Sequence, residues 1–507
     1  MAVGGMLVLG LASAPGMADQ PLSAIDWLSR SVAVPPPDIR APTSRPDENG
    51  LSHGEITVSP LADPSSDATG LLPAERSGVA RDFWGDAEAA RVAEEIRALD
   101  TGTLPALREL ILTILLSELD PPVGGEDERG DYFLARIDKL LDFGALDQAL
   151  AMIELVDTGD PEVFRRWFDI ALLLGQEQRP CEALRARPRL ETSYPARIFC
   201  IARGGDWSAA VVTLRSAEAL GQLTAEEEEV LARFLDPALF EDADPMPPLA
   251  RPSPLLWRML EAIGEPPPTR SMPLAFAQVD LGRNAGWKAQ IEAAERLTRA
   301  GALSPNRLLG LYTERAPAAS GGVWERVAAV QRLDRALTEG DVDAVASALP
   351  PAWEQMAQVE LETVLARLYA ERLQRLALPQ EAAELAFRAG LLSEGFEEVA
   401  SGHESDDAQE RFLVALALGE LAPQTPASGA LAEAVRAGFT DPVTEWGIGD
   451  EEQSLGLEVL AAIAALDAAA AGDLRGVSEG IATLRGAGLE HIARRAALEL
   501  MLLDRRG

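Results

Sequence analysis

Between Asp82 and Arg506, apolar residues recur every three or four positions, and charged or small residues fill most of the positions between them. This spacing places the apolar side chains along one face of an α-helix. No run of alternating β-branched residues in this part is long enough to define a sheet. The pattern therefore predicts an all-α protein.

Glycine and proline divide the pattern into separate helices. Helices are expected at residues 87–100, 104–119, 131–143, 145–157 and 161–174, and a last one at residues 492–503. The proline-rich segments 244–254 and 265–273 are expected to be loops, because proline lacks the backbone donor and disfavours the helical conformation before it. These loops suggest sub-blocks 82–243 and 274–507 within one helical region, 82–507.

Four junctions between helices share a pattern, a glycine followed by a polar or small turn and then by apolar residues. The glycines are Gly144, Gly205, Gly340 and Gly472. Glycine ends a helix in a left-handed conformation without steric cost, and the aspartate that follows three of them favours the start of the next helix. The small or apolar residues that follow at helical spacing are Ala149, Ile153 and Val156, Ala210, Leu214 and Ala217, and Val477, Ile481 and Leu484.

These junctions resemble those of the tetratricopeptide-type repeat. The resemblance implies an α-solenoid of antiparallel helix pairs, whose concave surface serves protein binding. The sequence departs from that family in two ways: the junctions are not separated by multiples of about 34 residues, and most of the aromatic positions of the first helix are missing. The alternative is a helical bundle without repeats.

The N-terminal part has a different character. Residues 3–14 form a small, apolar run that is too short to span a bilayer but is typical of a signal peptide, with cleavage expected after Ala18. No basic residue precedes this run, and the alternative is an unprocessed N-terminus. No later segment is long and apolar enough to span a membrane. We therefore expect a mature chain without a transmembrane span that is periplasmic or secreted.

The segment 19–81 is interpreted as a linker or tail, because its proline, serine, aspartate and glycine content from residue 34 onwards prevents burial of enough apolar surface. Within it, Ile56 and Val58 alternate with polar residues before Leu61, which suits an extended strand. This strand is either a docking motif for a partner or a local extended piece. Together with Trp27 and Trp446, these three residues are the candidates for partner contacts.

The two cysteines, Cys181 and Cys200, lie close in sequence. In an oxidising compartment they are expected to form a disulfide, and the alternative is two buried thiols. Their spacing is not Cys-x-x-Cys, which argues against a redox-active pair.

The charge balance excludes some partners. The chain has 45 Lys and Arg against 81 Asp and Glu, a formal net charge of −36. Such a polyanion repels nucleic acids and anionic lipid surfaces. We therefore expect no nucleic-acid partner.

Residues that could carry chemistry are sparse. The three histidines, His53, His403 and His491, are far apart and belong to no recognisable motif, and no phosphate-binding or nucleophile-elbow pattern is found. We predict no catalytic residue, cofactor or metal site. Core packing is expected of the tryptophans Trp84, Trp167, Trp207, Trp324 and Trp353.

The favoured hypothesis is thus a non-enzymatic scaffold or adaptor that binds other envelope proteins. A structural component of a large envelope assembly is the first alternative. An envelope enzyme acting on glycan or peptide through convergent carboxylates is the second.

Overall fold

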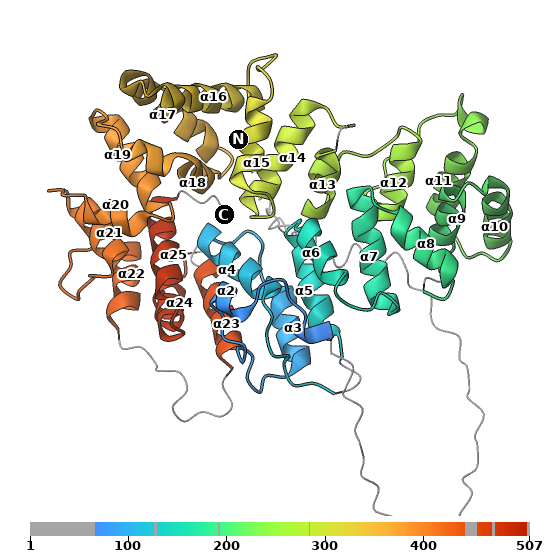
Figure 1. Cartoon of the computed structure of the whole chain (residues 1–507), viewed down its shortest axis with the longest axis horizontal. Coiled ribbons are helices and arrows are strands. Elements are labelled where there is room, and N and C mark those ends of the chain that lie inside the picture. Colours follow the sequence, from blue (N-terminus) through green and yellow to red (C-terminus); the bar gives the residue numbers. More distant parts are fainter. Residues whose placement is uncertain are drawn as a thin grey trace, which may run out of the picture.

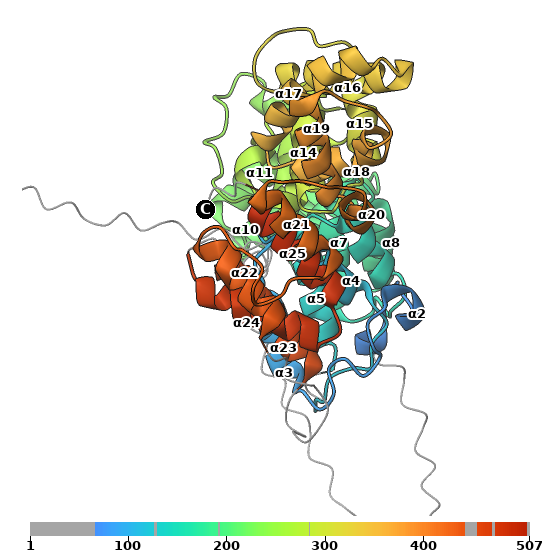
Figure 2. The same cartoon turned by 90° about the vertical axis from the view of Figure 1, so that its left-hand side faces the viewer.

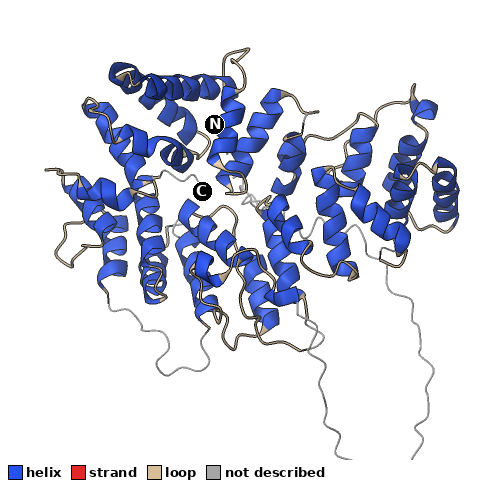
Figure 3. Ribbon diagram, in the orientation of Figure 1, coloured by secondary structure: helices blue, strands red, loops and turns tan. Residues whose placement is uncertain are grey.

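The computed structural model describes residues 66–125, 129–190, 193–282, 284–441, 454–468 and 472–503. Within these residues every regular element is a helix, and the β-type contacts are two isolated bridges, Leu72 with Ser117 and Glu88 with Val123. Figure 3 shows helices throughout the described chain. The all-α fold predicted from the apolar periodicity is confirmed.

The helices follow one another with short connections. The first half of the described chain contains η2 (Ser66–Ala68), α2 (Ala74–Ser77), α3 (Ala89–Ala98), α4 (Pro105–Leu116), α5 (Asp131–Asp142), α6 (Leu146–Ile153), α7 (Pro161–Leu174), α8 (Gln178–Ala186), α9 (Tyr194–Arg203), α10 (Trp207–Ala219), α11 (Ala225–Leu235), η4 (Pro237–Phe240) and α12 (Pro254–Ala262).

The second half contains η5 (Thr269–Ser271), η6 (Leu274–Phe276), α13 (Ala277–Asp280), α14 (Trp287–Arg299), α15 (Pro305–Thr313), α16 (Val323–Glu339), α17 (Val342–Ala357), α18 (Glu362–Leu373), α19 (Gln380–Leu391), α20 (Phe396–Ser401), α21 (Ala408–Leu418), α22 (Ala430–Thr440), α23 (Leu455–Asp467), α24 (Leu474–Gly486) and α25 (Glu490–Leu502). None of the described helices combines the length and apolar content that a membrane span requires.

Helix starts are set by local sequence. The carboxylate of Asp160 accepts hydrogen bonds from the backbone of Glu162, at 2.7 Å, and Val163, at 3.2 Å, at the start of α7. Ser253 and Ser304 cap α12 and α15 in the same way, and proline follows each of these three caps. Proline is tolerated there because the first helical turn leaves its amides without intrahelical partners.

The four glycine junctions have the conformation that the sequence predicts. Gly144, Gly205, Gly340 and Gly472 have φ of 71°, 89°, 70° and 92°, a left-handed region that favours glycine. At three of them an aspartate side chain then caps the following helix: Asp206, Asp341 and Asp473. The paired helices α5 and α6, α9 and α10, α16 and α17, and α23 and α24 pack against each other.

The small or β-branched residue that follows each of these glycines lies in the core. Ala149, Ala210, Val345 and Val477 are fully buried. A short side chain at this position lets the second helix of each pair approach the first closely. The sequence expectation is therefore confirmed for the glycine turns and for the small or β-branched residues that follow them, but not for Val156, which lies beyond the end of α6 and is half-buried.

The two ends of the described chain meet. Helix α4 packs against α25, and α3 packs against α23 (Figure 1 and Figure 2). The backbone amide of Gly456 donates to the carbonyl oxygen of Phe83 at 2.8 Å, and the amide of Ala106 donates to the buried Glu499 carboxylate at 2.9 Å. We call this set of contacts, between residues 66–120 and residues 454–503, the closure.

The described residues before Asp82 belong to the packed body. The buried guanidinium of Arg136 donates to the carbonyl oxygens of Thr69, Leu115 and Ser117 at 2.7–2.9 Å. The carboxylate of Asp67 accepts from the amides of Gly130 and Phe133 at 2.9 and 2.8 Å. The packed body thus extends to the N-terminal side of residue 82, into the segment interpreted from sequence as a tail.

Buried apolar residues form two clusters that do not follow chain order. One cluster joins helices α3–α12 with α20–α25 and part of α19, and the other lies within α13–α19 and includes Leu503. Helix α19 contributes to both, since Phe387 and Leu391 belong to the first and Ala386 and Ala389 to the second. The two cores therefore meet along α19, and they also meet between η6 and α13, where Phe276 belongs to the first and Ala277 to the second.

Candidate functional site

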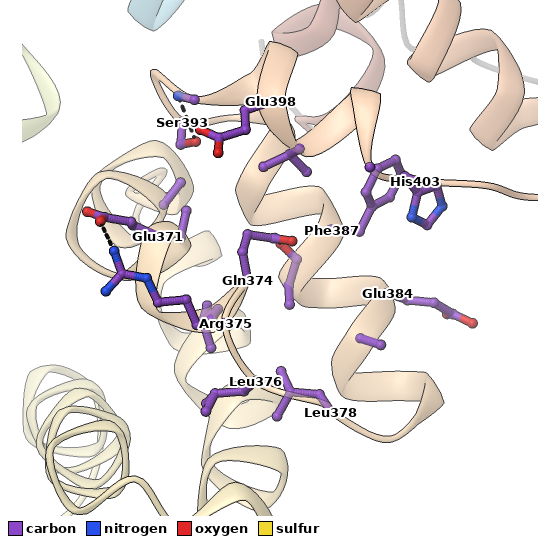
Figure 4. Close-up of a pocket in the computed structure, with 18 of the residues that line it drawn as sticks. Glu371, Gln374, Arg375, Leu376, Leu378, Glu384, Phe387, Ser393, Glu398 and His403 are labelled. Carbon is purple, nitrogen blue, oxygen red and sulfur yellow. Dashed lines mark hydrogen bonds and ion pairs between the residues drawn. The ribbon is translucent and has the colours of Figure 1, made fainter.

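A groove opens at the junction of the two cores. It is formed by α18, α19, α20 and the segment that leads into α21, and its volume is about 1120 Å³. Figure 4 shows the side chains of Gln374 and Arg375 on one side, Glu384 and Phe387 from α19 on the other, and Ser393 with Glu398 at one end. Apolar groups are supplied by Leu376, Leu378 and Val399, which are half-buried.

An aromatic pair fixes one wall of the groove. The imidazole of His403 stacks on the ring of Phe387, with centroids 3.6 Å apart and an interplanar angle of 13°. Nε2 of His403 lies 3.0 Å from a carboxylate oxygen of Glu410. Hydrogen bonds from Ser405 and from His403 lower the pKa of Glu410. The loop between α20 and α21 is thereby held against α19.

Polar contacts position the C-terminal end of α19. The amide Nε2 of Gln374, just beyond α18, donates to the carbonyl oxygen of Ala386 at 2.8 Å. The hydroxyl of Ser393 donates to the carbonyl oxygen of Gly390 at 2.7 Å. A Cβ at Gly390 would lie 2.7 Å from both Gln374 Nε2 and Val399, so glycine allows this close approach. The groove is therefore built on helices that are fixed to one another.

The charges of the groove are unbalanced. Its lining contains six carboxylates and two guanidinium groups. Both arginines are engaged: Arg375 pairs with Glu371, and Arg367 pairs with Glu109 of α4, outside the groove. Among the carboxylates, Glu410 contacts His403, and Asp407 caps α21. The exposed side chains of Glu384, Glu394 and Glu398 have no ion pair or hydrogen bond with any described residue.

A deeply buried ion pair lies away from the groove, in the second core. Arg326 of α16 donates to both carboxylate oxygens of Glu295 of α14, at 2.7 and 2.6 Å, and the hydroxyl of Tyr312 donates to the same carboxylate at 2.7 Å. Burial and the neighbouring carboxylate raise the pKa of Tyr312 well above its ordinary value. This network joins α14, α15 and α16 inside the second core.

In the part of the chain that the structure describes, no three or more His, Cys, Asp and Glu side chains are arranged so that they could hold a metal ion. What the groove offers a ligand is carboxylate charge, exposed amide and hydroxyl groups and half-buried apolar surface. Protein interfaces use such groups to bind a partner through apolar contact, hydrogen bonds and complementary charge.

Comparison of the chain with protein-family models, with curated proteins and with solved structures gives no match. The groove is therefore interpreted from its own residues.

The disulfide predicted from sequence is present. Cys181 of α8 and Cys200 of α9 are bonded, with their Cα atoms 5.1 Å apart, and both are buried. Because α8 and α9 are consecutive helices, the bond fixes one helix to the next in the part of the molecule farthest from the groove (Figure 1).

The structure does not describe the partner-contact candidates proposed from sequence. Trp27, Ile56, Val58, Leu61 and Trp446 fall outside the described residues, as does His53.

The tryptophans behave mostly as expected. Trp84 and Trp167 are buried, and Trp324 and Trp353 are half-buried against the second core. Trp207 departs from the expectation of core packing, since it is 46% exposed on α10 beside the exposed Val211 and Val212. It begins the outermost helix of its region, so no further helix covers that face (Figure 1).

Sequence reasoning missed the groove. From the sequence, His403 is only a histidine without a recognisable motif, while its stacking partner, Phe387, lies on α19. The one local signal was the segment Ser401–Asp407, where a histidine and three acidic residues follow each other closely. Nothing in the sequence pattern places that segment against α19.

Proposed function

We propose that the chain is an exported scaffold that binds other envelope proteins, and that its docking site is the groove along α19. The observation that carries the proposal is the unbalanced groove itself: three carboxylates without described partners lie on α19, on α20 and in the turn between them, and hydrogen bonds hold these elements in place. These exposed carboxylates are open to cationic groups of a partner, whereas the buried pair of Glu295 and Arg326 is already satisfied within the fold.

The size of the groove favours a protein ligand. Small-molecule pockets usually measure about 300–1,000 Å³ and enclose most of the ligand. This groove is larger and open to solvent, which suits a segment of a partner chain. Helix-built grooves commonly take such segments along an apolar floor with polar groups at the rim.

We further propose that the helices form an α-solenoid of antiparallel pairs of the tetratricopeptide type. The four left-handed glycines and the buried small residues that follow them support it, because each marks a helix–turn–helix unit. In such arrays each unit buries its apolar face against the next one.

Export is part of the proposal. A formed disulfide between Cys181 and Cys200 fits an oxidising compartment, where such bonds persist. The apolar run at residues 3–14 provides the expected signal sequence.

Site-specific photo-cross-linking in the native envelope tests this function. A photoreactive residue is placed at Glu384 or Glu398 in the groove, or at the exposed Glu226 of α11 as a control. We expect a discrete cross-linked partner from both groove positions and none from Glu226. A cross-linking pattern that is the same at all three positions, or no adduct from the groove, would contradict the proposal.

A further inference from the structure

Carboxylates at and near the groove are of two kinds: some pair with a neighbouring helix, and others line the groove without a described partner. Two neighbouring residues of α20 show the difference. Glu397 lies 2.6 Å from Nη2 of Arg494 on α25 and so ties α20 to the body. Glu398, the next residue, lines the groove and has no ion pair or hydrogen bond through its carboxylate with any described residue. Helix-dipole stabilisation in the first turn applies to both, so it does not explain why only one is paired.

The unpaired carboxylates surround the groove from more than one element. Glu384 lies one helical turn from Phe387 on α19, Glu394 lies in the turn that precedes α20, and Glu398 lies on α20 itself. Both arginines of the lining are already paired, so no cation of the groove itself offsets these three charges. A ligand that brought cationic groups would supply what the groove lacks, while an anionic one would be repelled.

Apolar surface lies between the charges. Leu376 and Leu378, in the connection between α18 and α19, are half-buried and line the same space, as does Val399. An apolar side chain of a ligand placed on them would lose water contact, which supplies affinity, while the carboxylates fix orientation.

Resting on the proposed function, we propose that the occupant of the groove is a basic segment of a partner protein, with arginine or lysine side chains that pair with Glu384, Glu394 and Glu398 and with an apolar side chain on Leu376 and Leu378. The net charge of −36 on the whole chain increases the rate at which such a segment arrives. Because the groove carboxylates are exposed, the contact is weakened by salt.

Fluorescence anisotropy with the full mature chain tests the proposal. The probes are labelled peptides of about ten residues, with arginine at alternate positions and a central leucine, and matched peptides with glutamine or glutamate in place of arginine. We expect binding of the arginine peptide alone, and an affinity that falls as salt is added. The variant Glu384→Gln/Glu394→Gln/Glu398→Gln should lose about tenfold in affinity, since each exposed charge pair contributes modestly.

The matched control changes the same number of charges elsewhere. Glu226, Glu241 and Glu339 are exposed and lie outside the groove lining. The variant Glu226→Gln/Glu241→Gln/Glu339→Gln should bind the arginine peptide as the unmodified chain does. Equal losses in both triple variants would mean that only the overall field attracts the peptide, and the proposal would be wrong.

The two proposals fail in different ways. Photo-cross-links from Glu384 and Glu398 together with binding of the glutamine peptide as tight as that of the arginine peptide would keep the docking function and overturn the basic occupant. Absence of both cross-links and peptide binding would overturn both.

Discussion

The closure and the groove are both rich in charge, and Arg367 of α18 lies at the border of the two, but their carboxylates have different surroundings. In the closure, Glu109 of α4 pairs with Arg367 and, at 2.8 Å, with Arg495 of α25. Burial raises the pKa of Glu109, but the two arginines outweigh it and hold the pKa below its ordinary value. In the groove, Glu384, Glu394 and Glu398 have no such partners.

The difference separates two uses of charge. Contacts in the closure join residues that are hundreds of positions apart, so their loss should be seen as lost stability. The carboxylates of Glu384, Glu394 and Glu398 join no elements, so their loss should be seen in binding and hardly in stability. Measurements of the free energy of unfolding can therefore test the distinction without any ligand.

The largest effect is expected at Arg136, which anchors the start of the described chain. Replacing it in the variant Arg136→Met leaves buried carbonyl oxygens of residues 69, 115 and 117 without their donor. We expect a loss of about 3–5 kcal/mol in unfolding free energy, measured by urea titration. Arg315→Met, on an exposed surface, should change it by less than about 0.5 kcal/mol; equal effects would contradict the account.

A steric test addresses the closure directly. A Cβ added at Gly456 would lie 2.4 Å from a ring carbon of the buried Trp84. Gly456→Ala should cost about 1–3 kcal/mol through overpacking. Gly310→Ala, in an exposed turn of α15 with open space around it, should instead stabilise the chain by about 0.5–1 kcal/mol. A neutral result at Gly456 would mean that the two ends of the chain do not pack as described.

The closure should also respond to pH. Burial raises the pKa of Asp467 from 3.8 to about 6, against the opposing effect of a hydrogen bond from Thr103. Since the folded state holds this proton more tightly than the unfolded state, its contribution is fully present below pH 3.8 and is lost as pH rises through about 6.

The variant Asp467→Asn keeps an acceptor for Thr103 but does not titrate. Relative to the unmodified chain, it should gain about 1–3 kcal/mol in stability between pH 4 and pH 7. Thermal unfolding of both proteins across this range measures the difference. A difference that is independent of pH would show that Asp467 has an ordinary pKa in the folded protein.

The smallest expected effect on stability comes from a comparison of one carboxylate of the closure with one of the groove. Glu109→Gln removes the negative charge that pairs with Arg367 of α18 and with Arg495 of α25. Because Glu109 is partly exposed, we expect a loss of about 1 kcal/mol in unfolding free energy. Glu398→Gln should leave stability within about 0.5 kcal/mol of the starting value. If Glu398→Gln lost more stability than Glu109→Gln, the distinction between charges that stabilise the fold and charges that bind a partner would be wrong.

Sequence reasoning was strongest where structure depends on near neighbours. The helix expected at residues 161–174 is α7, and the last helix, expected at residues 492–503, is Glu490–Leu502. Apolar spacing, N-caps and left-handed glycines all act within a few residues, so the sequence displays them directly. The pairing of Cys181 with Cys200 follows from the same proximity.

Contacts between distant residues could not be predicted. Ala106 and Glu499 are 393 positions apart, and helical periodicity says which face is apolar but not which other helix covers it. The groove depends on this kind of contact, because Phe387 and His403 meet only once α19, α20 and α21 have packed. The partner candidates chosen from sequence were aromatic and apolar residues that the structure does not describe, whereas the groove residues lie within the described helical part.

The most direct test of the central claim is amide hydrogen exchange of the full chain with and without the arginine peptide. The account predicts increased protection in α19, in α20 and in the loop that carries His403, with no change in α4 and α25 of the closure. Protection confined to the closure or to α10, with the groove unchanged, would contradict the assignment of the groove as the docking site.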